Sequence, residues 1–260
     1  EAFLQETSDV AAKKNTLRQL ARLYEAELKD HSKAAERLEQ LHVLEPDDDA
    51  VSAQLAELYD KQGEEPKLAE ILEAQLKQAK RKDPALEARL LERLVGLYQG
   101  SLAAPDKAFN AARRLFVLQP RESLESELGR LADALARTGD LAQTYLEAAQ
   151  RSPGDARRLR VRAAQLFVSA GDRKRARAVI DQLLEVDARD KDALVLLDGL
   201  MAKDASPEEH AAVLEGRLRA CDDARERVAT LLVLADVLIK LRRTDDAVAR
   251  LREALDTDSG

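Results

Sequence analysis

The chain has 260 residues, of which 45% are hydrophobic, 35% charged and only 3% aromatic, and its formal net charge is −7. An acidic chain with few aromatic rings argues against nucleic-acid binding, which needs a basic surface for phosphates and rings on which bases stack. The single cysteine, Cys221, excludes an intrachain disulfide and a cysteine-rich metal site, and no stretch approaches the roughly 20 apolar residues of a membrane span.

Apolar residues recur at spacings of three and four along the whole chain, which predicts helices and no strands. The predicted helices form seven pairs. In chain order they cover 15–28 and 33–44, 49–62 and 66–80, 85–99 and 106–118, 123–137 and 141–150, 155–170 and 173–186, 190–203 and 207–220, and 224–241 and 245–255. Residues 1–13 are expected to end a preceding hairpin, so we interpret the chain as a piece of a longer array.

The ends of these helices have local causes in the sequence. Pro66 and Pro207 each fit the first turn of a second helix, because proline has no N–H to lose there. Gly63 and Gly171 follow first helices at points where the chain must turn. Proline and glycine therefore mark several of the turns between the two helices of a pair.

One short pattern recurs in the first helix of most pairs. The segment 20–24 (LARLY) has counterparts at 55–59, 94–98, 131–135, 163–167 and 234–238. Small residues mark fixed positions in the first helices (Ala21, Ala56, Ala132, Ala164, Ala235) and in the second helices (Ala34, Ala108, Ala176, Ala247). Because small side chains let helices approach closely and the period is roughly 36 residues, the sequence predicts stacked helical hairpins.

This pattern resembles that of the tetratricopeptide repeat family over nearly the whole chain. The resemblance implies an all-α fold, a right-handed superhelical solenoid of about seven antiparallel helix-turn-helix repeats, with the first helices lining a concave surface. Individual units depart from the family: its leading tryptophan is absent, Leu68 and Thr144 replace the second small residue, and the sixth unit barely matches. We expect one domain over 1–260, with units at 15–46, 49–84, 85–120, 121–153, 155–188, 190–222 and 224–258.

Pairs of arginines on the first helices are the candidate partner-binding residues. Residues at i and i+4 share one helical face, and a guanidinium presents a planar fork that suits carboxylates. Three first helices carry such pairs: Arg18 and Arg22, Arg89 and Arg93, and Arg158 and Arg162. This placement is similar to the two-carboxylate clamp of some chaperone-binding repeat proteins, but the asparagines of that clamp are missing here.

The charge distribution singles out one segment. Residues 151–180 contain nine basic and two acidic residues, a local charge of +7 in a chain of net −7. One interpretation is that this segment attracts an acidic partner to the fifth unit, where Arg158 and Arg162 would contact it. The other is a solvated arginine-rich face that is compensated by acidic neighbours such as Asp181 and Glu185.

No sequence pattern indicates a catalytic, metal-binding or phosphate-binding site. The three histidines are far apart and lack metal-ligand spacing, and no glycine-rich phosphate loop or nucleophile motif is present, so we predict no enzyme activity, no metal and no cofactor. An aromatic row at repeat spacing, Tyr24, Tyr59 and Tyr98, has Leu135, Phe167 and Leu238 as its counterparts. The sequence therefore predicts that this position needs bulk for core packing and no hydroxyl group.

The sequence thus predicts a protein–protein interaction scaffold that binds a partner protein or an acidic peptide on its concave surface. The alternative is a structural spacer within a larger repeat protein of a bacterial assembly, with self-association through the end hairpins. Nucleic-acid binding through the basic segment is a third and weaker interpretation. The lone cysteine is compatible with the cytoplasm, which is slightly favoured, and with the periplasm.

Overall fold

The structure, a computed structural model, describes residues 10–79, 83–204 and 206–258. Over these residues it contains only α-helices, and none of them is long and apolar enough to cross a membrane. The helices are α2 (Val10–Ala26), α3 (His31–Leu44), α4 (Asp49–Gln62), α5 (Glu65–Ala79), α6 (Pro84–Gln99), α7 (Pro105–Leu118), α8 (Glu122–Ala134), α9 (Thr138–Arg151), α10 (Ala156–Ser169), α11 (Arg173–Val186), α12 (Lys191–Asp204), α13 (Pro207–Ala220), α14 (Ala224–Lys240) and α15 (Thr244–Asp258).

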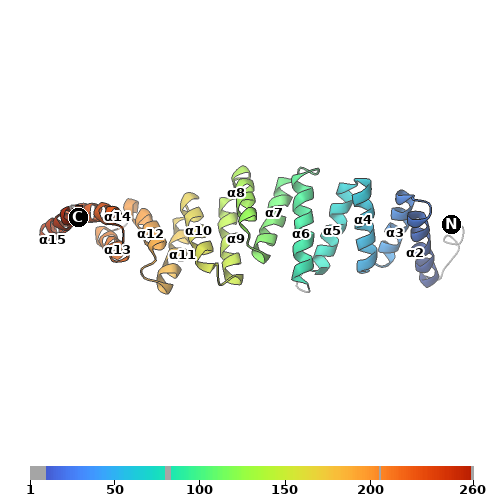
Figure 1. Ribbon diagram of the computed structural model, residues 1–260, viewed down its shortest axis with the longest axis horizontal. Coiled ribbons are helices and arrows are strands. Elements are labelled where there is room, and N and C mark those ends of the chain that lie inside the picture. The colour runs from blue at the N-terminus through green and yellow to red at the C-terminus, as the bar shows by residue number, and fades with distance from the viewer. Residues whose placement is uncertain (1–9, 80–82, 205, 259–260) are drawn as a thin grey trace. The chain divides into compact units, whose positions relative to one another are not determined.

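Consecutive helices pair antiparallel as helical hairpins, which confirms the predicted order of elements. The chain divides into two compact units. Unit 1, Glu1–Gln119, holds the three pairs α2/α3, α4/α5 and α6/α7, and unit 2, Pro120–Gly260, holds the four pairs from α8/α9 to α14/α15. Within each unit the helices follow one another in chain order (Figure 1). The division falls between Gln119 and Pro120, in the loop that joins α7 to α8.

The observed helix ends follow the predicted signals closely. Aspartates cap several helices: the Asp48 carboxylate, for example, accepts hydrogen bonds from the backbone N–H groups of Ala50 (3.0 Å) and Val51 (3.2 Å) at the start of α4. Gly63 has a φ of +69°, the left-handed conformation that ends α4. The largest difference is in the first helix, which was expected to begin at residue 15 and begins at Val10 as α2. Residues 10–13 therefore belong to the first described hairpin, and residues 1–9 lie outside the described part.

The recurring small residues lie in the helix contacts, as the repeat pattern predicted. All nine alanines at the two repeat positions are at most 3% exposed: Ala21, Ala34, Ala56, Ala108, Ala132, Ala164, Ala176, Ala235 and Ala247. A larger side chain at any of them would push two helices apart. The fold is therefore a tetratricopeptide-like array of helical hairpins.

The sixth hairpin, α12/α13, replaces both small residues with polar ones. Asp198 stands at the first position and His210 at the second, and the imidazole Nε2 lies 2.6 Å from a carboxylate oxygen of Asp198. Arg217 of α13 donates a hydrogen bond to the other oxygen of Asp198 and contacts Glu226 of α14 at 3.3 Å. The departure of this unit from the repeat pattern is thus a half-buried polar cluster that joins three helices.

Candidate protein-binding groove

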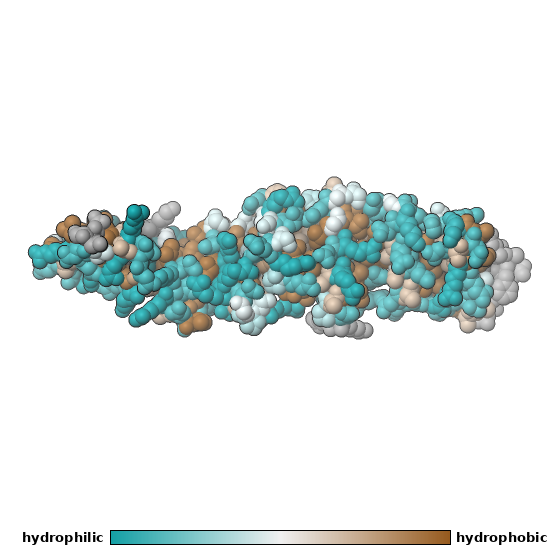
Figure 2. All heavy atoms as spheres, viewed as in Figure 1, coloured by the Kyte–Doolittle hydropathy of each residue, from teal (hydrophilic) through white to brown (hydrophobic). Residues whose placement is uncertain are grey.

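A groove with a volume of about 940 Å³ lies in unit 1, where the first helices α4 and α6 and the end of α5 meet. Its apolar lining is formed by Ala53 and Ala56 of α4, Ala79 of α5, and Leu86 and Leu90 of α6. Leu86 is 37% exposed, so an apolar side chain at the edge of the groove is open to a ligand. Elsewhere hydrophilic side chains cover most of the face seen in Figure 2, with hydrophobic ones between them.

The two walls of this groove carry opposite charges. On the α4 wall Asp49 and Glu57 are two helical turns apart and line the groove together. On the α6 wall the predicted pair Arg89 and Arg93 lies one turn apart on the same face. The groove can therefore attract a carboxylate on one side and a cation on the other.

These charged groups have few partners of their own. The Arg93 guanidinium lies 3.2 Å from the Asp60 carboxylate, and both side chains are well exposed, so the pair is worth well under about 1 kcal/mol. Among the described residues, Arg89 contacts only a backbone carbonyl of its own helix, that of Ala85, at 3.5 Å. In the part of the chain that the structure describes, Asp49 and Glu57 form no ion pair. The groove thus has charge available for a ligand.

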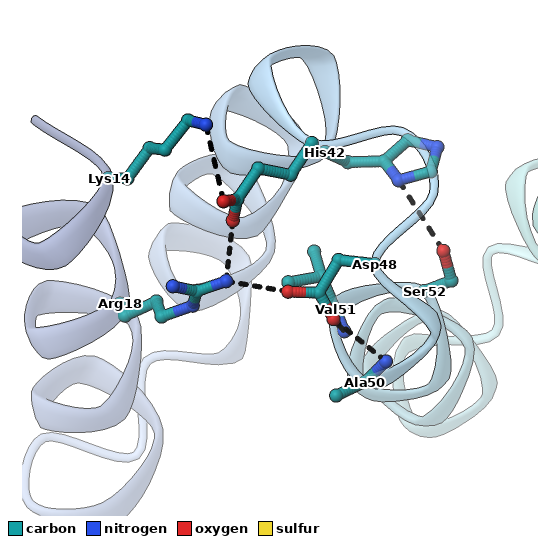
Figure 3. A network of polar contacts seen from close by, with 8 residues as sticks. Lys14, Arg18, His42, Asp48, Ala50, Val51 and Ser52 are labelled. Carbon is teal, nitrogen blue, oxygen red and sulfur yellow. Dashed lines mark hydrogen bonds and ion pairs between the residues drawn. The ribbon is translucent and has the colours of Figure 1, made fainter. Parts of the chain in front are cut away.

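The predicted pair Arg18 and Arg22 is divided, and Figure 3 shows the surroundings of Arg18. The Arg18 guanidinium lies between the carboxylates of Glu45, at 2.5 Å, and Asp48, at 2.6 Å, and Lys14 reaches Glu45 at 3.3 Å. Burial raises the pKa of the Asp48 carboxyl, but hydrogen bonds from the Val51 N–H and from Arg18 outweigh it and leave this pKa below its ordinary value. Arg18 therefore joins α2 to the end of α3 and the start of α4, while Arg22 is exposed and outside this network.

The third predicted pair is also divided. One nitrogen of Arg158 lies 2.7 and 2.8 Å from the two carboxylate oxygens of Glu125 on α8, and Arg158 contacts Asp155 at 3.4 Å. Within the described part of the chain, the one polar contact of Arg162 is with the amide oxygen of Gln165, at 3.4 Å. Arg158 is thus engaged in joining α10 to α8, which leaves Arg162 as the more available member of the pair.

Acidic neighbours neutralise much of the basic segment 151–180. Arg157 binds the Asp190 carboxylate through two nitrogens, at 2.8 and 2.9 Å, and Asp192 at 2.7 Å. Its hydrogen bonds to Asp190 raise the pKa of Arg157. Further ion pairs at 2.6 to 2.7 Å join Arg175 to Asp172 and Arg177 to Asp181. These pairs favour the compensated-face interpretation over attraction of an acidic partner.

The tyrosine row has a polar role that the sequence analysis missed. The Tyr59 hydroxyl donates a 2.7 Å hydrogen bond to Glu39 of the preceding hairpin. Lys67 donates to the same carboxylate at 3.0 Å, and its ammonium lies 5.4 Å from the centroid of the Tyr59 ring. The prediction that this position needs only bulk was incomplete, because here the hydroxyl joins two hairpins.

The same triad recurs one hairpin later, where Tyr98 donates to Glu73 and Lys107 lies 3.3 Å from Glu73 and 5.3 Å from the Tyr98 ring centroid. The hydrogen bond from Tyr98 lowers the pKa of Glu73. Burial and the neighbouring carboxylate raise the pKa of Tyr98. The sequence does contain a signal for the triad, since a lysine precedes the second small position in each of the first three hairpins (Lys33, Lys67 and Lys107).

Among the described residues, no three His, Cys, Asp or Glu side chains are grouped so as to hold a metal ion. His42 lies 3.4 Å from the Ser52 hydroxyl, and His210 belongs to the Asp198 cluster. Each of these two histidines thus has a polar neighbour on another helix of the array.

In the comparisons with known proteins, only solved structures are similar to this chain. No protein-family model matches the chain, and no curated sequence matches it. A structure of Naa15/Naa10 bound to HypK-THB shares 19% identity at a TM-score of 0.47; the match covers 93% of this chain and 36% of that one. The yeast Sti1 TPR2AB domain, in a complex with pHSP90, shares 14% identity at a TM-score of 0.32 over 96% of this chain and 92% of that one. A tetratricopeptide repeat protein from Parabacteroides merdae shares 16% identity at a TM-score of 0.36 over 94% and 93%.

Proposed function

We propose that the protein is an interaction scaffold and that the groove of unit 1 holds a segment of a partner protein. The observation that carries this proposal is the groove itself, which combines an apolar lining with two walls of opposite charge. Ligand sites in proteins are typically concave, largely apolar and of a few hundred cubic ångströms, with a few polar groups that fix orientation. A volume of about 940 Å³ suits several consecutive side chains of a peptide.

The charges of the walls define the segment that fits. The acidic side chains of the segment face Arg89 and Arg93 on α6. This part of the proposal keeps the acidic peptide that the sequence analysis predicted as the partner. The basic side chains of the segment face Asp49 and Glu57 on α4, and an apolar side chain packs on Leu86 and the neighbouring alanines. Complementary charges of this kind fix the direction in which a segment lies, and they discriminate against segments with the opposite order.

A selection experiment tests this proposal. Random 16-residue peptides displayed on phage are selected on the full chain, and the affinities of selected peptides are measured by fluorescence anisotropy. Ala53→Trp fills the groove from an exposed position on α4, and Arg89→Glu reverses one wall charge. Lys174→Glu, at an exposed position in the first turn of α11 in unit 2, makes the same charge change outside the groove.

The proposal predicts that Ala53→Trp abolishes binding and that Arg89→Glu weakens it about tenfold, while Lys174→Glu changes it less than twofold. A tenfold loss corresponds to about 1.4 kcal/mol, which is reasonable for a reversed charge at a partly enclosed site. A selection in which no peptide loses affinity for Ala53→Trp or Arg89→Glu would contradict the groove as the site. Failure to select any peptide would favour the spacer role instead.

A further inference from the structure

A second and smaller pocket, of about 270 Å³, opens between the second helices α5 and α7 of unit 1. Its floor consists of buried apolar side chains: Leu91 and Leu94 come from α6, and Leu76 comes from α5. The pocket shares no lining residue with the groove, which is bordered by the first helices. It is therefore a separate feature of the surface.

The rim of this pocket is basic. Lys77, Lys107 and Arg114 line it against a single carboxylate, that of Glu73, which leaves a local charge of three minus one, or +2. Glu73 is already shared between the Tyr98 hydroxyl and Lys107, and Arg114 lies 2.8 Å from Glu87. Lys77 is exposed and forms no ion pair among the residues that the structure describes.

We propose that this pocket binds one apolar side chain of a partner protein whose neighbouring residue is aspartate or glutamate. The volume of about 270 Å³ is less than a third of that of the groove, so it suits a single side chain of the leucine or phenylalanine type, and not a longer segment. The apolar floor provides burial for this side chain, and Lys77 provides the cation for the adjacent carboxylate.

The charge of the partner distinguishes this pocket from the groove. The groove is lined by four carboxylates, of Asp47, Asp49, Glu57 and Asp83, and by two guanidiniums, so it favours a segment that includes basic residues. The pocket between α5 and α7 favours an acidic one. Unit 1 would then hold two different segments, one on its first helices and one on its second helices.

The experiment uses the full chain carrying Ala53→Trp, so that the groove is filled before selection begins. A library of random 16-residue peptides is displayed with free amino ends on phage, and selected peptides are resynthesised with amidated carboxyl ends. Amidation removes the terminal carboxylate, so any remaining anion must be an aspartate or glutamate side chain. Affinities are then measured for the Lys77→Glu and Lys77→Arg variants, with Lys174→Glu as the control for net charge.

We expect peptides in which aspartate or glutamate adjoins leucine, phenylalanine or methionine. Lys77→Glu should weaken their binding about three- to tenfold at 50 mM salt and less at 500 mM, where exposed charges are screened. Lys77→Arg and Lys174→Glu should keep the affinity within twofold. Peptides enriched in lysine or arginine, peptides insensitive to Lys77→Glu, or no selected peptide at all would overturn this inference. Because the groove is tested without the Ala53→Trp background, its proposal would stand or fail separately.

Discussion

The triad of Tyr59, Glu39 and Lys67 makes a quantitative prediction for the Tyr59→Phe variant. The substitution removes only the phenolic oxygen, so it deletes the 2.7 Å hydrogen bond to Glu39 without opening a cavity. The ring remains, and Lys67 keeps its position over it. A phenylalanine already occupies the corresponding site of α10, where the Arg175 guanidinium lies 4.6 Å from the Phe167 ring centroid. The backbone and the core are therefore expected to tolerate the change.

The size of the effect depends on the exposure of the acceptor. A hydrogen bond to a charged group is worth about 1.5–3 kcal/mol. The Glu39 side chain is 41% exposed, so water replaces part of what the phenol supplies. We therefore expect Tyr59→Phe to lower the free energy of unfolding of unit 1 by about 1 kcal/mol. Combining Tyr59→Phe with Glu39→Gln should cost less than the sum of the single changes, because the hydrogen bond that Tyr59→Phe deletes is the one that Glu39→Gln weakens by removing the charge of its acceptor.

Hydrogen exchange read by mass spectrometry is the appropriate assay, because units 1 and 2 need not unfold in a single transition. Peptides from α3, α4 and α5 should exchange faster by the factor that corresponds to about 1 kcal/mol, while peptides from unit 2 should not change. The matched control is Glu36→Gln, which removes an equal charge from an exposed position of the same helix α3. Equal exchange in Tyr59→Phe and wild type, or strictly additive effects in the double variant, would refute the reasoning.

Three other predictions concern stability. Between pH 5 and pH 3 the free energy of unfolding in urea should fall more for the wild type than for Tyr98→Phe. The hydrogen bond from Tyr98 lowers the pKa of Glu73 below its ordinary 4.5, so the stabilisation is present above that pH and is lost as the pH falls. Identical pH profiles of the two proteins would refute this prediction. Arg157→Met should lower the free energy of unfolding by about 2 kcal/mol, because the Asp190 side chain is only 2% exposed and would lose its ion pair with the Arg157 guanidinium. An unchanged urea midpoint would contradict this prediction. Gly96→Ala should raise the free energy of unfolding by roughly 0.5–1 kcal/mol, since the added Cβ meets no atom within 4 Å beyond the adjacent turns of its own helix, and thermal melting would reveal a clash as a lower Tm.

The helical hairpins could be predicted because their signals are local. Proline, glycine and capping aspartates mark helix ends through backbone chemistry within a few residues, and the small residues mark helix contacts through their period. The sixth hairpin shows where this reasoning stops. Asp198 and His210 occupy the two small positions, and their contact, which the sequence pattern does not indicate, joins α12 to α13 there.

The arginines show a second limit of sequence reasoning. The spacing of Arg158 and Arg162 correctly places both on one helical face, but it says nothing about what lies opposite. Arg158 meets Glu125, which is 33 residues away in the chain, and Arg18 meets Asp48, which is 30 residues away. Arg89 and Arg93 differ because they line a groove and because the one pair that Arg93 makes across hairpins, with Asp60, is well exposed. Pairing across hairpins therefore decides which predicted residues remain available to a partner.

The central claim is that a partner segment lies in the groove between α4 and α6. The most direct measurement is hydrogen exchange of the full chain with and without a saturating amount of a peptide selected on the wild-type chain. The account predicts slower exchange in Asp49–Gln62 and Pro84–Gln99 and no change in α10 or α14. Protection confined to unit 2, or none in α4 and α6 at saturation, would contradict it.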